Sequence, residues 1–125
     1  MLQETDVNCK EQLSKRGKRS RDKGKRGERE VAKIFQEAGF HARRSVQYNG
    51  RPGTAADVVG VPGLHIEVKL VEKESIRAWY RQAQRDAHAS PENEMPVIVH
   101  RKSREPWLVT MSLEDFIKII KQEGE

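Results

Sequence analysis

The chain has little cysteine and no long apolar segment. Among its 125 residues, the single cysteine, Cys9, excludes an intramolecular disulfide and a cysteine-cluster zinc or iron–sulfur site. No apolar run approaches the roughly 20 residues of a membrane helix, and no secretory signal follows Met1. Hydrophobic residues make up 35% of the chain, which suffices for one small core. We therefore expect a soluble, cytoplasmic protein with a single folded domain.

Positive charge is in excess, and it is concentrated at the N-terminus. The chain has 24 Lys and Arg against 19 Asp and Glu, and its pI is about 9.5. Residues 1–26 hold nine basic and four acidic side chains, which accounts for the whole net charge of +5. Few large apolar side chains lie in this segment, so we predict a flexible basic arm ahead of a folded body at residues 27–125. Such an arm binds nucleic acid through counterion release; the alternative is a tail that only keeps the protein in solution.

Hydrophobic periodicity in the body predicts an α/β fold. We expect helices at residues 27–39, at 75–89 and from 113 onward, and strands at 40–46, 57–61, 65–71, 96–101 and 107–111. Gly50, Pro52 and Gly53 predict a mobile loop between residues 47 and 56. Ser112 and Asp115 form a capping box for the last helix. Its apolar face is expected to hold Leu113, Phe116, Ile117 and Ile120. The order of elements predicts a small mixed β-sheet flanked by helices.

Asp57, Glu67 and Lys69 are the residues whose pattern suggests chemistry. Glu67 and Lys69 are two apart on a predicted strand, so both project from one face, roughly 7 Å apart. A tight turn should bring Asp57 beside them. With the Val68 carbonyl, the two carboxylates would suit a hard divalent cation such as Mg²⁺, and Lys69 could hold phosphoryl oxygens or act on the attacking water. The alternative is that Glu67 and Lys69 are ordinary solvated residues.

Several short motifs together resemble the archaeal-type (Hjc-like) Holliday junction resolvases, members of the PD-(D/E)xK nuclease superfamily with relatives in phages. The motifs are Gly27-Glu28-Arg29-Glu30-Val31, Gly39-Phe40, Arg44-Ser45, Asp57 and Ile66-Glu67-Val68-Lys69. The resemblance implies a restriction-endonuclease-like core whose catalytic residues are Glu28, Asp57, Glu67 and Lys69. The metal, Mg²⁺ with Mn²⁺ as a substitute, would be bound by Glu28, Asp57, Glu67 and Val68. Ala56 stands where the family has proline before the aspartate.

The choice of Glu28 rests on the resemblance alone. On a helical wheel Glu28 lies about 70° from the centre of the apolar stripe and Glu30 about 90° away on the other side. Spacing does not choose between them, and either acid also suits the N-terminal end of a helix.

Further residues are predicted to bind DNA or to approach the site. The resemblance places Arg44 and Ser45 near the scissile strand, and the full DNA-binding set is Lys25, Arg26, Arg29, Arg43, Arg44, Ser45, Arg51, Arg81 and Gln82. The stripe formed by Arg77, Arg81 and Arg85 fits a phosphate-binding face or a plain solvated helix face equally well. His65 shares the strand face of Glu67, so it either approaches the metal or is peripheral.

The resemblance implies a metal-dependent endonuclease of DNA recombination and repair. It would cut four-way junctions symmetrically as a homodimer, by attack of water, and leave 5′-phosphates; it would act in the host cytoplasm if the protein is viral. Two alternatives remain: a less selective nuclease on the same fold (flap-cutting, nicking or nonspecific), or a non-catalytic DNA-binding protein.

Overall fold

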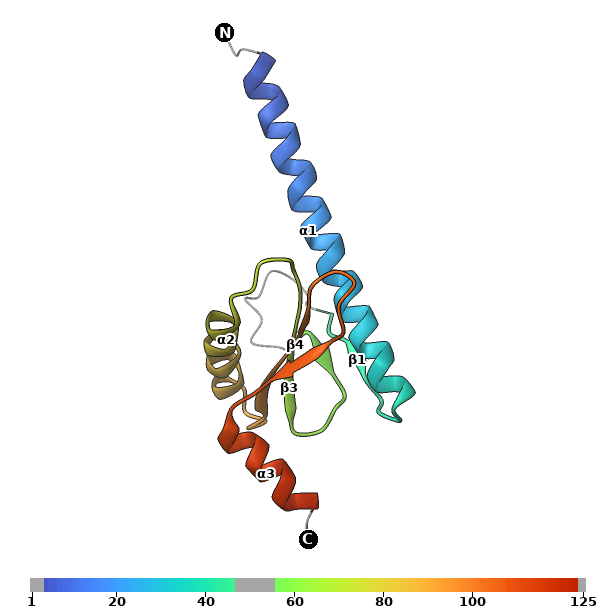
Figure 1. Ribbon diagram of the computed structural model, residues 1–125, viewed down its shortest axis with the longest axis vertical. Helices are drawn as coiled ribbons and strands as arrows, with labels where there is room; N and C mark the ends of the chain where they lie inside the picture. Colours follow the sequence, from blue (N-terminus) through green and yellow to red (C-terminus); the bar gives the residue numbers. More distant parts are fainter. Residues whose placement is uncertain (1–3, 47–55, 124–125) are drawn as a thin grey trace.

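The structure is a computed structural model that describes residues 4–46 and 56–123. Figure 1 shows a small sheet, a long first helix and a last helix at the far end of the molecule. The elements are α1 (Glu4–Glu37), β1 (Arg43–Arg44), β2 (Val58–Val59), β3 (Leu64–Leu70), α2 (Ile76–Ala89), β4 (Met95–Arg101), β5 (Leu108–Thr110) and α3 (Leu113–Glu123). The predicted order of a helix, three strands, a helix, two strands and a helix is confirmed. The loop predicted at residues 47–56 lies outside the described residues except for Ala56.

The five strands form one mixed sheet in the order β1-β2-β3-β4-β5. β3 and β4 are parallel, and the other neighbouring pairs are antiparallel. α2 connects the two parallel strands, as such a crossover requires. The turn before β3 includes Gly60, whose φ of +96° is a left-handed conformation that suits glycine. This turn pairs Val58 with Ile66 and so sets Asp57 next to β3, as predicted.

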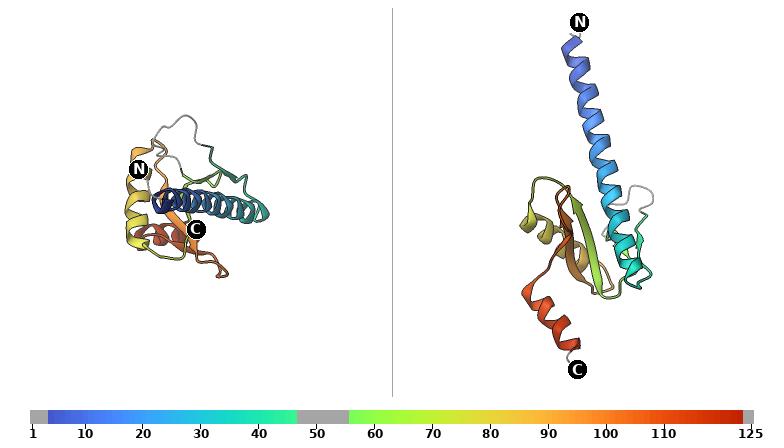
Figure 2. Two further views of the ribbon diagram at one scale, coloured as in Figure 1. Left: turned by 90° about the horizontal axis from the view of Figure 1, so that it is seen from above. Right: turned by 45° about the vertical axis from the view of Figure 1, so that its right-hand side comes forward.

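The two faces of β3 differ in chemical character. Ile66, Val68 and Leu70 alternate along the strand and are at most 7% exposed. Ile66 and Val68 belong to the core that includes Val31 and Ala32 of α1. α2 buries Ala83 and Ala87 on the opposite side, so the sheet lies between the two helices (Figure 2). His65, Glu67 and Lys69, on the other face of β3, therefore lie toward α2.

The first helix is longer than predicted. The predicted start at residue 27 is wrong because α1 begins at Glu4 and runs without interruption to Glu37. The segment contains no proline and many Lys, Arg, Glu and Gln residues, which are good helix formers. Its N-terminal part projects beyond the sheet (Figure 1), while Lys23 makes an ion pair of 2.9 Å with Glu72 of the body. The division into an arm and a folded body stays a prediction.

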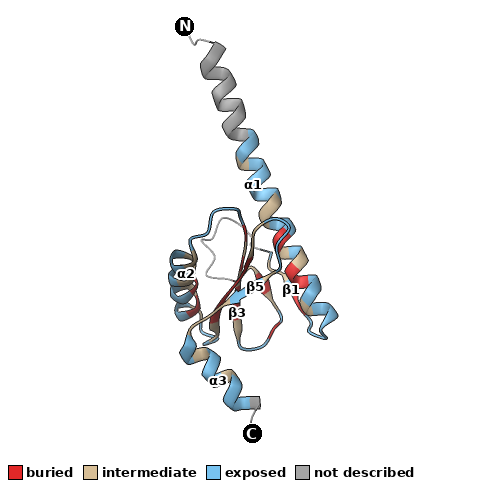
Figure 3. Cartoon of the chain, in the orientation of Figure 1, coloured by how far each residue is buried: buried red, intermediate tan, exposed pale blue. Residues whose placement is uncertain are grey.

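Two local features place α1 and α3. A Cβ atom at Gly27 would lie 3.0 Å from Cβ of Leu70, so glycine allows α1 to pack closely on β3 beside Glu28. The predicted cap of α3 is present, since the Asp115 backbone N–H donates to Oγ of Ser112 at 3.0 Å. The apolar face of α3 lies largely in solvent, with Leu113 72% and Ile120 52% exposed (Figure 3). No helix in the described part of the chain is long and apolar enough to span a membrane.

Candidate active site

The four predicted catalytic residues line one cavity of about 380 Å³. Glu28 comes from α1, Asp57 from the residue before β2, and Glu67 and Lys69 from the polar face of β3. The remaining lining residues are Ser20, Gly24, Val68, Leu70, Val71, Gln82 and Asp86. The fold therefore brings together acids that are 39 residues apart in the chain.

Backbone hydrogen bonds fix Asp57 at the edge of this cavity. Its N–H donates to the carbonyl of Ile66 at 2.8 Å, and its carbonyl accepts from the Ser45 N–H at 2.9 Å. The carboxylate accepts a further hydrogen bond of 2.9 Å from the Val68 N–H. Asp57 is thus tied to β3 through both its backbone and its side chain, which holds it next to Glu67.

The environment of Asp57 is strongly unfavourable to a negative charge. Burial, followed by the negative charge of Glu67, raises the pKa of Asp57 from its ordinary value of 3.8 to about 8, and Glu28 contributes in the same direction. A divalent cation bound between the carboxylates would relieve this repulsion, and oxygen ligands are those that Mg²⁺ and Mn²⁺ prefer. The donor set therefore fits the predicted metal.

The structure separates the two glutamates between which helix geometry could not choose. Glu28 lines the cavity, and its Oε2 lies 2.6 Å from Nε of Arg44, an ion pair with both side chains partly buried. Glu30 instead pairs with Arg101 at 2.8 Å. Glu28 is therefore the acid placed to act in the cavity, and Arg44 orients its carboxylate.

One group of potential metal-ligating side chains in the described residues includes two members outside the predicted metal set. One ligand atom each of His65, Glu67 and Asp86 lies within 4.8 Å of the others. Nε2 of His65 is 3.0 Å from Oε1 of Glu67, and His65 is only 1% exposed. It lies beside Glu67 but lines a neighbouring cavity and not the main one, so its approach to the metal stays a prediction. Asp86 was missed as a site residue. It lies one helical turn from Gln82 on α2, and that spacing is the signal that could have found it.

Sequence and structure comparisons identify the family and the fold. A profile of the family described as "Phage putative PDDEXK endonuclease" matches residues 19–124. The chain belongs to this family. Its fold is similar to that of Hjc from Archaeoglobus fulgidus, a Holliday junction resolvase, with a TM-score of 0.54 and 24% sequence identity over 70% of this chain and 76% of that chain. No curated protein matches the sequence.

These findings confirm two predictions. The chain belongs to a PD-(D/E)xK endonuclease family, and its α/β fold, a five-stranded mixed sheet with three helices, is like that of Hjc. At 24% identity the resolvase structure supports the fold and not a shared substrate.

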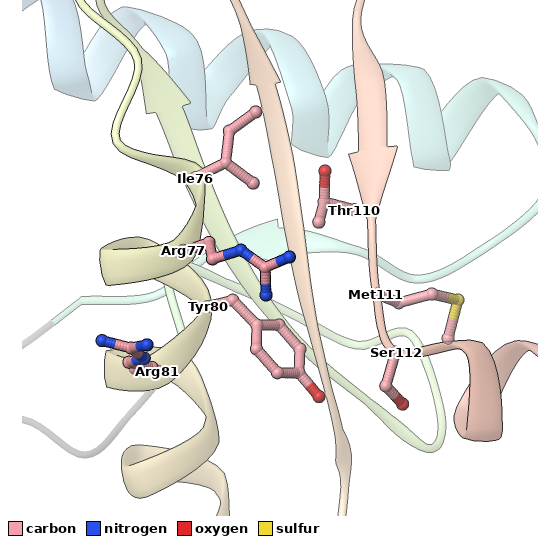
Figure 4. A pocket seen from close by; sticks show the side chains of 7 residues that line it. All are labelled: Ile76, Arg77, Tyr80, Arg81, Thr110, Met111 and Ser112. Atoms are coloured by element: carbon pink, nitrogen blue, oxygen red, sulfur yellow. The ribbon is translucent and has the colours of Figure 1, made fainter.

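The residues predicted to bind DNA are spread over three cavities and the exposed surface of this endonuclease. Lys25, Arg44 and Ser45 line a cavity of about 310 Å³ that also contains Glu28 and Asp57, while Gln82 lines the main cavity. Arg81 borders a separate groove between α2 and the start of α3, into which Arg77 and Tyr80 point (Figure 4). Arg26, Arg29 and Arg43 are exposed and border none of these cavities, and Arg51 lies outside the described residues.

Proposed function

We propose that this nuclease is a metal-dependent DNA endonuclease that cuts four-way junctions in the cytoplasm. The observation that carries the proposal is the convergence of Glu28, Asp57, Glu67 and Lys69 on one cavity. Two glutamates and a lysine beside a strongly perturbed aspartate are suited to hydrolysis of a phosphodiester with a divalent cation. The branched substrate is proposed by analogy with the archaeal Holliday junction resolvase whose fold is similar.

Each residue of the cavity has a distinct part in this proposal. Asp57, Glu67, Glu28 and the Val68 carbonyl would hold Mg²⁺ or Mn²⁺, which supplies charge stabilisation at the phosphate and lowers the pKa of a bound water. Lys69 lies on the same strand face as Glu67 and would hold a non-bridging phosphate oxygen through its ammonium group. Water attack in line with the leaving oxygen would leave a 5′-phosphate and a 3′-hydroxyl.

The distribution of positive charge supports backbone recognition of DNA. Lys25, Arg44 and Ser45 lie beside the acids and would contact the phosphates that flank the cut. We propose the same role for the exposed residues Arg26, Arg29 and Arg43, and for Arg51, Arg81 and Gln82. Residues 4–19 of α1 extend about 24 Å at 1.5 Å per residue. The end of this part that carries Lys15, Arg16, Lys18 and Arg19 would therefore reach a neighbouring duplex arm, and binding should be sensitive to salt.

Symmetric cutting of a junction needs two active sites, so we propose a homodimer related by a two-fold axis. The surface that supports it is formed by β5 and α3. β5 is an edge strand with Leu108 55% and Val109 61% exposed, and α3 exposes Leu113, Phe116, Ile117 and Ile120. Burial of such a surface against a second copy is favourable. In sedimentation or light scattering, wild type should be dimeric and Phe116→Asp monomeric.

The proposed activity is tested on a synthetic four-way junction, a flap and a linear duplex, each with Mg²⁺ and with EDTA. We expect Mg²⁺-dependent, paired cuts in the junction and at least tenfold slower cutting of the other two substrates. Equal rates on all three would favour the less selective nuclease. Binding without cutting by wild type would favour the non-catalytic alternative.

Glu28 and Glu30 offer a matched pair for this assay. Glu28→Gln should reduce cutting by a factor of about 100 or more, because it removes a carboxylate from the cavity. Glu30→Gln makes the same chemical change two residues away on the same helix and should cut like wild type. Equal loss in both variants would contradict the proposed site.

A further inference from the structure

His65, Glu67 and Asp86 form a cluster that the proposed catalytic set does not use in full. His65 and Glu67 are two apart on β3 and therefore on the same face, and Asp86 reaches them from α2. Glu67 is the one member that also belongs to the predicted metal set. His65 precedes Glu67 on β3 and Asp86 comes from α2, whereas Asp57 approaches from the residue before β2.

The distances in this cluster are close to those of a metal site. The three ligand atoms lie within 4.8 Å of one another, and the pair from His65 and Glu67 is 3.0 Å apart. At bond lengths of about 2.1 Å, ligands of one cation lie about 3 Å apart at right angles and about 4.2 Å apart when opposite. An adjustment of about half an ångström would complete the site, which a rotation of the partly exposed Asp86 side chain can supply.

The surroundings of His65 favour metal binding through Nε2. The imidazole is 1% exposed, so its orientation is fixed, and Nε2 is directed at Glu67. His65 also lines a cavity of about 290 Å³ that contains Glu92 and Glu94. Because the carboxylate oxygen of Glu67 can only accept, the contact at 3.0 Å places a proton on Nε2, and a bound cation would take the place of that proton.

We propose that His65, Glu67 and Asp86 bind a second divalent cation, with Glu67 shared between this ion and the one at Asp57. This inference deepens the proposed function and rests on it for the part of Glu67 in the first site. A site with one imidazole nitrogen and two carboxylates favours Mn²⁺ and other transition metals over Mg²⁺, while the all-oxygen first site accepts both. The two sites should therefore differ in metal preference.

The test counts Mn²⁺ ions on the untagged full-length chain without DNA. Electron paramagnetic resonance of free Mn²⁺ gives the number bound, and electron spin echo modulation detects an imidazole nitrogen on the metal. We expect two ions per wild-type chain and a nitrogen signal that persists when excess Mg²⁺ displaces one ion. Asp86→Asn should bind one ion and lose the nitrogen signal, whereas Glu114→Gln on α3 should match wild type.

Two further variants make the result specific. His65→Gln keeps a polar side chain in the buried position but removes the imidazole, so it should abolish the nitrogen signal. Asp57→Asn should lose the other ion and keep that signal. The proposal is overturned by a single ion per wild-type chain, by an unchanged count in Asp86→Asn, or by loss of both ions in Asp57→Asn. Failure of the proposed function is a separate observation, since wild type would then bind metal but leave every DNA substrate uncut.

Discussion

The raised pKa of Asp57 makes a specific prediction about stability and pH. In the metal-free protein, burial and the charge of Glu67 keep a proton on this carboxyl up to about pH 8, whereas the unfolded chain releases it near 3.8. Between these values the folded state holds more protons than the unfolded state. Stability contributed by this group is therefore fully present below pH 3.8 and is lost as the pH rises toward 8.

Asp57→Asn isolates this effect because the amide cannot ionise yet can still accept the hydrogen bond from the Val68 N–H. Each unit of pKa difference corresponds to about 1.4 kcal/mol. Relative to wild type, we expect the variant to gain roughly 3 to 4 kcal/mol in free energy of unfolding between pH 5 and pH 8. Urea unfolding in EDTA at several pH values measures this difference.

Metal should narrow the difference in free energy of unfolding between the two proteins. At pH 8, Mg²⁺ at a hundred times its dissociation constant should stabilise wild type by about 2.7 kcal/mol and Asp57→Asn far less. Glu114→Gln, a change to an exposed acid of α3, is the matched control and should follow wild type at every pH. If the difference in free energy of unfolding between Asp57→Asn and wild type stays constant from pH 5 to pH 8, the pKa of Asp57 is not raised. That result would refute the proposed effect of burial and neighbouring acids on Asp57.

Three other changes test separate parts of the structure. Deletion of residues 1–22 should weaken DNA binding and lower the slope of log affinity against log salt by about 2 to 5. The thermal unfolding of the body should not change. An unchanged affinity for DNA would indicate that the segment only keeps the protein in solution. Arg44→Gln removes the ion pair with Glu28 and should slow cutting about tenfold or more, while the circular dichroism spectrum stays like that of wild type. Full activity would show that Glu28 does not need Arg44 to orient its carboxylate. Gly60→Ala should lower the free energy of unfolding by about 2 kcal/mol or more. The added Cβ would lie 2.0 Å from the carbonyl oxygen of His41, and residue 60 has a φ of +96° that alanine adopts only with strain. A urea midpoint equal to that of wild type would contradict this.

The parts of the site that follow local rules were predictable from the sequence. Alternation along β3 placed Glu67 and Lys69 on one face, with Ile66 in the core on the other. A short turn with Pro62 and Gly63 predicted that Asp57 would come to lie beside this strand. Both inferences use only the period of a strand and the reach of a turn. Each needs fewer than a dozen residues of sequence, and the structure agrees with each.

The parts that depend on packing between distant elements were not predictable. Asp86 faces Glu67 because α2 packs on the sheet through Ala83 and Ala87. Helical spacing marks Asp86 as a neighbour of Gln82 on the helix surface, but it does not show that this surface meets Glu67. The long α1 differs from prediction for a related reason. Composition alone favoured a flexible arm, but a helix that is already nucleated in the body extends at little cost through good helix formers.

The hydrophobic face of β3 accounts for how this chain tolerates so many acids in one place. Ile66, Val68 and Leu70 are almost fully buried, and burial of such side chains contributes roughly 5 to 8 kcal/mol together. The rise in the pKa of Asp57 from 3.8 to about 8 corresponds to a cost of roughly 6 kcal/mol above pH 8, which is of similar size. Because the same strand carries both faces, the core that offsets the repulsion also fixes the acids in position. Ile66→Ala should therefore weaken Mn²⁺ binding as well as stability, although its side chain points away from the cavity.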